Sequence, residues 1–82
     1  MVKPEDIDTC PCCRHKIGPF QEYYICPICF WEIDFWQTDN PDDPDGANGI
    51  SLKEGQTNYL KYGACTQNSV SHVRPPRAEE MS

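Results

Sequence analysis

Hydrophobic and polar residues alternate along residues 30–36 of the chain. The apolar side chains of Trp31, Ile33 and Phe35 share one face of an extended chain there, and the acids between them share the other face. This period of two predicts a half-buried antiparallel strand. Residues 23–25 have the sequence Tyr-Tyr-Ile, which is aromatic and β-branched and predicts a second short strand just before it.

Residues 37–50 are dominated by proline, glycine, aspartate and asparagine, so they predict a long acidic loop. We expect a helix to follow at residues 51–63. Ser51 and Glu54 have the spacing of a capping box at its start, and Gly63 is placed to end it in the left-handed conformation. The apolar stripe of this helix, which we expect to pack on the sheet, consists of Leu52, Tyr59 and Leu60.

The cysteine spacing adds a metal site to this picture. Cys10, Cys13, Cys26 and Cys29 follow the pattern Cys-x2-Cys-x12-Cys-x2-Cys, which is typical of a four-thiolate zinc site with Zn–S distances of about 2.3 Å. Alignment of the two turns selects Cys13 rather than Cys12 as a ligand, so we expect one structural Zn²⁺. A disulfide framework and a redox dithiol are the alternatives. A redox dithiol needs only one such pair, normally beside a βαβ unit that the pattern lacks.

Together these patterns predict a small zinc-stapled α+β fold. It is a zinc-ribbon β-hairpin with rubredoxin-type knuckles, and one C-terminal helix packs on its small antiparallel sheet. We expect a polar lead-in at residues 1–9, one domain at 10–74 and a flexible, proline-broken tail at 75–82. A chain of 82 residues has a small core, and structural zinc contributes about 10–16 kcal/mol in small peptides. The metal is therefore expected to be the main stabilising element.

Charge restricts the function classes. The formal net charge is −6, and four thiolates with one Zn²⁺ add −4 and +2, giving −8. No lysine or arginine occurs between Lys16 and Lys53, a stretch that contains seven acids. A nucleic-acid-binding ribbon needs a cationic track to displace counterions, so the charge disfavours that class. It favours a basic protein as the partner.

The start of the chain and its cysteine content indicate a compartment. Residues 1–6 lead directly into acidic residues without the apolar segment of a secretory signal. No run approaches the roughly 18 apolar residues of a membrane span. Six cysteines without such a signal indicate metal binding in a reducing environment rather than three disulfides. We therefore expect a cytoplasmic protein without membrane association.

Cys12, Cys65 and His72 have no place in the four-thiolate site. One hypothesis is that the three form a second metal site. Another is that Cys65 and His72 form a thiol–imidazole catalytic pair. The simpler interpretation is a buried free thiol and a hydrogen-bonded histidine, because the sequence shows neither an orienting acid nor an oxyanion site.

Five blocks of the sequence, in the right order, resemble the bacterial cysteine-rich CPCC family over about residues 9–76. The resemblance implies a small bacterial or phage-borne cytoplasmic protein and brings no established activity. Arg14 departs from the glycine expected after a zinc turn. The blocks are residues 10–13 (CPCC), 26–32 (CPICFWE), 46–52 (GANGISL), 63–65 (GAC) and 72–76 (HVRPP).

These observations lead to an expected function. We expect a non-enzymatic, zinc-stabilised acidic module that binds a basic protein, as an immunity or inhibitor protein does. The alternatives are a nucleic-acid-associated zinc ribbon, and a thiol or redox protein that uses Cys12 or Cys65. Aromatic anchors within an acidic rim are expected to form the partner-binding face. That face consists of Glu32, Asp34, Trp36, Asp39, Asp42, Asp43 and Asp45.

Overall fold

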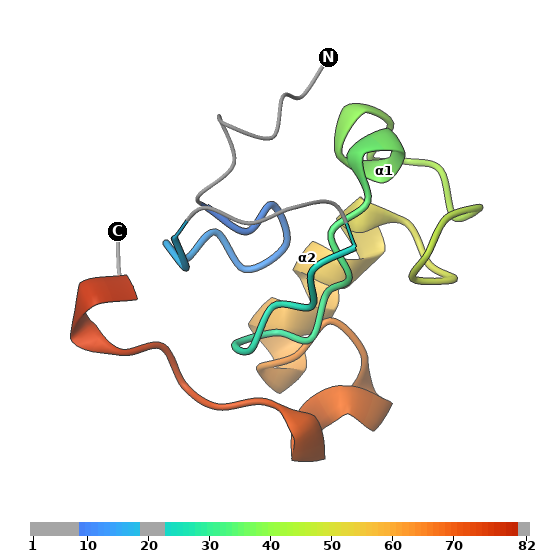
Figure 1. The fold of residues 1–82 in the computed structure, drawn as a ribbon. Helices are drawn as coiled ribbons and strands as arrows, with labels where there is room; N and C mark the ends of the chain where they lie inside the picture. The colour runs from blue at the N-terminus through green and yellow to red at the C-terminus, as the bar shows by residue number, and fades with distance from the viewer. Residues whose placement is uncertain (1–8, 19–22, 81–82) are drawn as a thin grey trace.

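The computed structural model describes residues 9–18 and 23–80 of the chain. Its elements, in order, are the helices α1 (Phe35–Asp39) and α2 (Leu52–Tyr62) and the 3-10 helices η2 (Gln67–His72) and η3 (Ala78–Glu80) (Figure 1). Residues 1–8 of the expected lead-in and residues 81–82 of the expected tail lie outside the described residues. Among the described helices, none has the length and apolar character needed to cross a bilayer.

The predicted antiparallel sheet is wrong, and with it the α+β fold. Within residues 9–18 and 23–80 no strand forms, and the only β-type pairings are the isolated bridges Thr9–Lys16 and Ile25–Glu32. Each bridge closes a tight turn around a cysteine pair, so the chain curls back on itself before a ladder can extend. The helices therefore pack on two cysteine turns instead of on a sheet.

The two cysteine turns, which we call knuckle 1 (residues 9–16) and knuckle 2 (residues 25–32), repeat one backbone pattern. In each knuckle the first cysteine accepts a bond from the amide four residues on and donates to the carbonyl five residues on. The shared geometry brings both sulfurs of each pair to the same side of the loop. The bonds are Arg14 N to Cys10 O (2.8 Å), Cys10 N to His15 O (3.0 Å), Phe30 N to Cys26 O (2.8 Å) and Cys26 N to Trp31 O (2.9 Å).

The residue that follows the last cysteine of each knuckle has a left-handed backbone. Arg14 has φ 65° and Phe30 has φ 70°. Glycine adopts this conformation freely, whereas another residue held in it costs on the order of 1–3 kcal/mol. The glycine expected in place of Arg14 thus corresponds to a real backbone requirement. Other interactions of the fold must offset this cost at both knuckles.

Asp34 lies two residues after knuckle 2, at the end of the extended chain, and is the cap residue of α1. Its Oδ1 accepts from Gln37 N (3.2 Å), and its Oδ2 accepts from Ala47 N (3.0 Å). The strand predicted over residues 30–36 is therefore wrong: the segment contributes only the isolated bridge at Glu32 and then enters α1. The alternation holds as far as Ile33, which is fully buried, but Phe35 is already helical. Asp34, expected on the solvent side, is buried because it bonds two backbone segments at once.

The acidic loop after α1 is organised around a pair of side-chain amides. Gln37 is fully buried, and its Nε2 donates to Asp43 O (2.9 Å) and Ile50 O (2.7 Å). Its Oε1 accepts from Asn48 Nδ2 (2.9 Å). Asn48 also brackets the backbone of Glu32, accepting from its N–H (2.8 Å) and donating to its carbonyl (2.8 Å). These bonds fix the acidic loop to knuckle 2.

Helix α2 begins and ends at local capping residues. The Ser51 hydroxyl accepts from an amide of the first turn (3.1 Å), and Gly63 ends the helix with φ 82°. Leu52 and Gly55 face the core, but Leu60 is 88% exposed, so its expected place in a packed stripe is wrong. The buried side of α2 consequently rests on few residues.

The core of the described chain is dominated by sulfur. Gly55 lets α2 approach it closely: a Cβ there would lie 2.9 Å from Trp31 Cζ3 and 3.3 Å from Cys12 Sγ. Partly buried Ile17, Phe30, Phe35, Ile50 and Tyr59 surround the cluster. Its buried members are Cys10, Cys12, Cys13, Cys26, Ile28, Cys29, Trp31, Ile33, Leu52 and Cys65.

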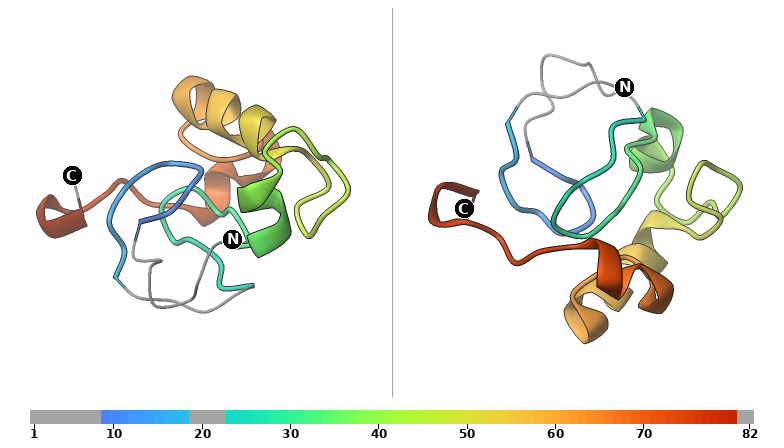
Figure 2. Two further views of the ribbon diagram at one scale, coloured as in Figure 1. Left: turned by 90° about the horizontal axis from the view of Figure 1, so that it is seen from above. Right: turned by 60° about the horizontal axis from the view of Figure 1, so that its bottom comes forward.

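The segment of residues 73–80, which we call the C-terminal strap, crosses both knuckles (Figure 2). Arg74 N donates to Pro27 O of knuckle 2 (3.2 Å), and Lys16 N of knuckle 1 donates to Glu80 O (2.7 Å). The Arg74 guanidinium forms a two-pronged pair with the Glu80 carboxylate, each N···O distance being 2.8 Å. The strap thus joins the two knuckles on the outside of the molecule.

We predict that Gly55→Ala destabilises the protein although alanine is the better helix former. The new Cβ would clash with Trp31, which is fully buried, and overpacking typically costs about 1–3 kcal/mol. Thr57→Ala, on the exposed side of the same helix, is the control and should leave stability within about 0.5 kcal/mol. Urea unfolding of the metal-loaded proteins measures both changes. A more stable Gly55→Ala protein would contradict this packing.

Candidate metal centre

Four cysteine sulfurs come together between the knuckles. The Sγ atoms of Cys10, Cys13, Cys26 and Cys29 all lie within 4.8 Å of one another, and all four residues are buried. Cys10 Sγ is 3.6 Å from Cys29 Sγ, and Cys13 Sγ is 3.8 Å from Cys26 Sγ. A tetrahedron with metal–sulfur distances of about 2.3 Å has edges of about 3.8 Å. The cluster could therefore accept one metal ion with little movement of the sulfurs.

The backbone around knuckle 2 holds its sulfurs from several directions. Ile28 N donates to Cys26 Sγ (3.4 Å), a contact that stabilises a thiolate. Cys65 N, from the segment after α2, donates to Cys29 O (2.7 Å), and the strap bonds to Pro27 O. Residues far apart in the sequence thus fix the position of these two ligand candidates.

The titration of the four thiols favours a cation between them. Hydrogen bonds with neighbouring thiols, together with burial, raise the pKa values of Cys10 and Cys29. Hydrogen bonds with neighbouring thiols lower the pKa values of Cys13 and Cys26. Without a cation, some of the four sulfurs keep their protons, because crowded buried thiolates repel one another. A divalent ion would displace these protons, since cysteine binds metal as the thiolate.

The comparison with known families agrees with the cysteine motif. A family model described as Cysteine-rich CPCC matches residues 8–80. The chain belongs to the cysteine-rich CPCC family. No curated protein matches the chain. The match confirms the resemblance carried by the five sequence blocks, and the first and last cysteines of the CPCC motif are two of the four clustered ones.

The other two cysteines of this CPCC protein lie outside the four-sulfur cluster. Cys12 is buried against α2, beside Gly55. Cys65 is buried too, and burial, followed by the charge of Cys12, raises the pKa of its thiol to about 12. His72 is exposed and stacks on Phe30 with ring centroids 5.1 Å apart. In the described part of the chain, no second group of three or more potential ligand side chains lies together, so Cys12, Cys65 and His72 are not gathered.

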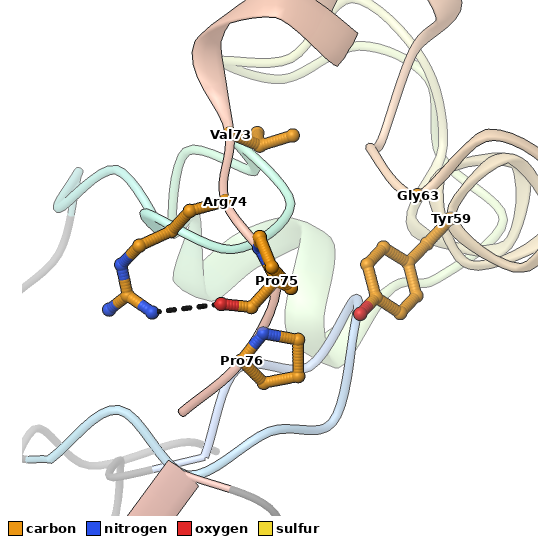
Figure 3. A pocket seen from close by; sticks show the side chains of 6 residues that line it. All are labelled: Tyr59, Gly63, Val73, Arg74, Pro75 and Pro76. Atoms are coloured by element: carbon orange, nitrogen blue, oxygen red, sulfur yellow. Dashed lines mark hydrogen bonds between the residues drawn. The ribbon is translucent and has the colours of Figure 1, made fainter. Parts of the chain in front are cut away.

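His15 links knuckle 1 of this CPCC protein to α2. Its Nε2 lies 3.1 Å from the Tyr59 hydroxyl, and burial followed by the nearby cysteines raises the pKa of that phenol to about 12. Tyr59 faces the two prolines of the strap across a hollow of about 300 Å³ (Figure 3). The hollow is lined by Tyr59, Gly63, Val73, Arg74, Pro75 and Pro76.

The expected partner-binding residues divide into two groups. Asp34 is a buried helix cap and cannot be part of a surface, and Glu32 is half-buried in knuckle 2. The remaining residues, Trp36, Asp39, Asp42, Asp43 and Asp45, lie on α1 and the loop after it, and we call them the acidic face.

Hydrogen bonds order the acidic face. Trp36 is 59% exposed, and its Nε1 donates to Asp43 Oδ2 (2.7 Å). Asp43 Oδ1 accepts from Asp45 N (2.8 Å). These two bonds lower the pKa of the Asp43 carboxyl. Asp42 forms an exposed ion pair with Lys53 (3.0 Å), and exposed pairs contribute little.

Sequence reasoning missed Gln37 and Asn48, the two residues that hold the acidic face to knuckle 2. Gly46 offers an indirect signal, because a Cβ there would clash with the Gln37 side chain. A glycine in a polar loop is common for other reasons, however, and its contact with Gln37 spans nine positions of sequence.

We predict that Cys26→Ser abolishes metal binding and folding, whereas Cys65→Ser, at an equally buried cysteine, keeps one metal ion per chain. Cys26 supplies one corner of the cluster, and structural sites of this kind contribute about 10–16 kcal/mol, comparable to the whole stability of a small domain. Native mass spectrometry counts the metal, and circular dichroism follows folding.

Cys12→Ser should behave as Cys65→Ser does. Retention of the metal by Cys26→Ser, or full folding of the wild-type protein in excess chelator, would contradict the assignment of the cluster. Loss of a second metal ion from Cys65→Ser or from a His72→Ala variant would restore the two-site hypothesis.

Proposed function

We propose that this CPCC protein is a zinc-stabilised acidic module that binds a basic protein partner without catalysing a reaction. Its action is stoichiometric, as in an immunity or inhibitor protein, and its compartment is the cytoplasm. The metal-site spacing of four of the six cysteines supports a reducing environment rather than a disulfide framework.

The chemistry of the cluster supports zinc as its metal. Four thiolates in a buried tetrahedral arrangement are a soft donor set typical of structural zinc. Such a site has no open coordination position for a substrate, so the metal would act by holding the knuckles together. Its binding energy would also offset the left-handed backbone at Arg14 and Phe30.

The observation that carries the proposal is the exposed indole of Trp36 within four aspartates. The core buries Trp31, the other tryptophan, completely. The fold can therefore bury an indole ring, and Trp36 nevertheless stays at the surface. Its bond to Asp43 holds the ring in place, which reduces the entropy lost when a partner binds. Aromatic anchors with a charged rim are typical of protein interfaces, and an acidic rim fits a basic partner.

The remaining charges support the same class of partner. Lys53, which lies at the acidic face, pairs with Asp42. The other described cations lie on knuckle 1, the end of α2 and the strap, where Arg74 pairs with Glu80. A nucleic acid would find no continuous cationic track along the acidic face. Catalysis by Cys65 is also disfavoured, because the raised pKa keeps its thiol neutral and weakly nucleophilic at neutral pH.

We predict that reversing Asp39, Asp42 and Asp45 to lysine slows association with the partner by about tenfold or more at low salt and leaves zinc content unchanged. These three carboxylates are exposed, whereas Asp43 is left intact because it supports Trp36. The partner is first isolated from the native host with the zinc-loaded protein as bait. Binding kinetics are then measured at low and at physiological ionic strength.

Glu79→Lys is the control, since Glu79 is an exposed acid on the strap, and its association rate should stay near that of the wild type. Trp36→Ala should chiefly raise the dissociation rate, as loss of an interface anchor does. An association rate that is independent of salt and of the three reversals would refute the proposal. Turnover of a substrate by the purified protein would move it to the enzyme class.

A further inference from the structure

A second hollow, of about 210 Å³, opens between knuckle 2, the acidic loop and the segment after α2. It does not involve the clustered cysteines. Ligand pockets for whole small molecules usually have volumes of about 300–1,000 Å³, so this hollow has the size for one side chain of a larger partner. Its lining residues are Ile25, Phe30, Glu32, Ala47, Asn48, Cys65, Thr66 and Ser69.

One side of this hollow is apolar and firmly held. Phe30 is fixed by its left-handed backbone and by the stack of its ring on His72. Ile25 and Ala47 contribute further apolar surface. These walls suit the methylene stem of a long side chain, and the ring of Phe30 adds a face on which a flat cation can lie.

The other side of the hollow carries one charge among neutral polar groups. Among the described residues that line it, Glu32 is the only ionisable acid or base besides the Cys65 thiol. The Asn48 side chain brackets the Glu32 backbone at 2.8 Å on both its N–H and its carbonyl, so the base of that side chain is fixed. The hydroxyls of Thr66 and Ser69 lie 2.8 Å apart and can accept further hydrogen bonds.

We propose that this hollow binds an arginine side chain of the basic partner, with its guanidinium on the Glu32 carboxylate and its stem along Phe30. This proposal rests on the proposed function, because it supplies the specific recognition element of the same partner. A planar guanidinium can pair with a carboxylate through two hydrogen bonds and stack on an aromatic ring at once, which a lysine ammonium cannot. The negative charge of Glu32 excludes phosphates and carboxylates from the site.

The test is a titration of ¹⁵N-labelled, zinc-loaded protein with a capped Gly-Arg-Gly peptide, followed by NMR. We expect saturable shifts of the amides of Ala47, Asn48, Thr66 and Ser69. The same peptide with citrulline, which has the shape of arginine without its charge, should bind about tenfold more weakly or not at all. The lysine peptide should also bind more weakly than the arginine peptide.

Two variants and one control distinguish binding in the hollow from a general effect of negative charge on the surface. Glu32→Gln should lower the affinity for the arginine peptide by about tenfold, the effect expected for loss of a charge-assisted hydrogen bond. Glu79→Gln removes the same charge from the exposed strap, outside the hollow and the acidic face, and should change the affinity by less than about twofold, as expected for a screened exposed charge. Ala47→Leu narrows the hollow without changing charge and should also abolish the shifts.

The outcomes distinguish this inference from the proposed function. Equal binding of the citrulline or lysine peptide, or an unchanged affinity in Glu32→Gln, overturns the arginine pocket. If partner association stays salt-dependent and sensitive to the acidic face while the peptide causes no shifts, only the pocket fails. If the peptide binds as expected while association with basic proteins is absent, the proposed function fails and the arginine pocket stands.

Discussion

The approach of four buried thiols to within 4.8 Å of one another is the constraint on which the rest of this structure depends. Such sulfurs repel one another as thiolates, and a cation between them would remove this repulsion. The knuckles that create this arrangement hold Arg14 and Phe30 in a left-handed backbone. Every other part of the described chain attaches to these knuckles: α2 through Gly55, the segment after it through Cys65, and the strap through its bonds to both loops.

Side-chain hydrogen bonds replace a sheet as the second level of organisation. Knuckle 2 and the residues flanking it pair their own backbone through Cys26 N to Trp31 O and Ile33 N to Tyr24 O, and in a larger sheet the remaining N–H and C=O of Glu32 would bond to a further strand. Here Asn48 supplies both partners for Glu32, and the Asp34 carboxylate bonds the start of α1 and the acidic loop. Gln37 is buried at the centre with its amide satisfied. Buried polar groups stabilise a fold only when they are fully paired, so this loop has one well-defined arrangement.

The sequence correctly predicted features that depend on the spacing of neighbouring residues. It failed for features that depend on contacts between residues far apart in the chain. Cysteine spacing was sufficient for the four-sulfur cluster, and capping chemistry for the roles of Ser51 and Gly63 at the ends of α2. The alternation at residues 31–35 was interpreted as a strand because it is the same pattern whether or not a neighbouring strand exists. Asp34 has the local chemistry of a surface acid and of a helix cap alike, and its bond to Gln37 N shows that it is a cap, while its bond to Ala47 N explains its burial. No local pattern points to Gln37 and Asn48, whose partners lie up to sixteen positions away.

Asn48 supports both candidate binding features, the smaller hollow and the acidic face. Asn48 fixes Glu32 at the side of the smaller hollow and also bonds to Gln37, which lies beneath the acidic loop. The hollow and the acidic face are therefore parts of one hydrogen-bonded body that rests on knuckle 2. A partner that engages both would meet a surface ordered before contact, so less of its binding energy would be lost to ordering. Knuckle 2 supplies two of the four clustered cysteines, so a metal ion held there would support this preorganised surface from below without touching the partner itself.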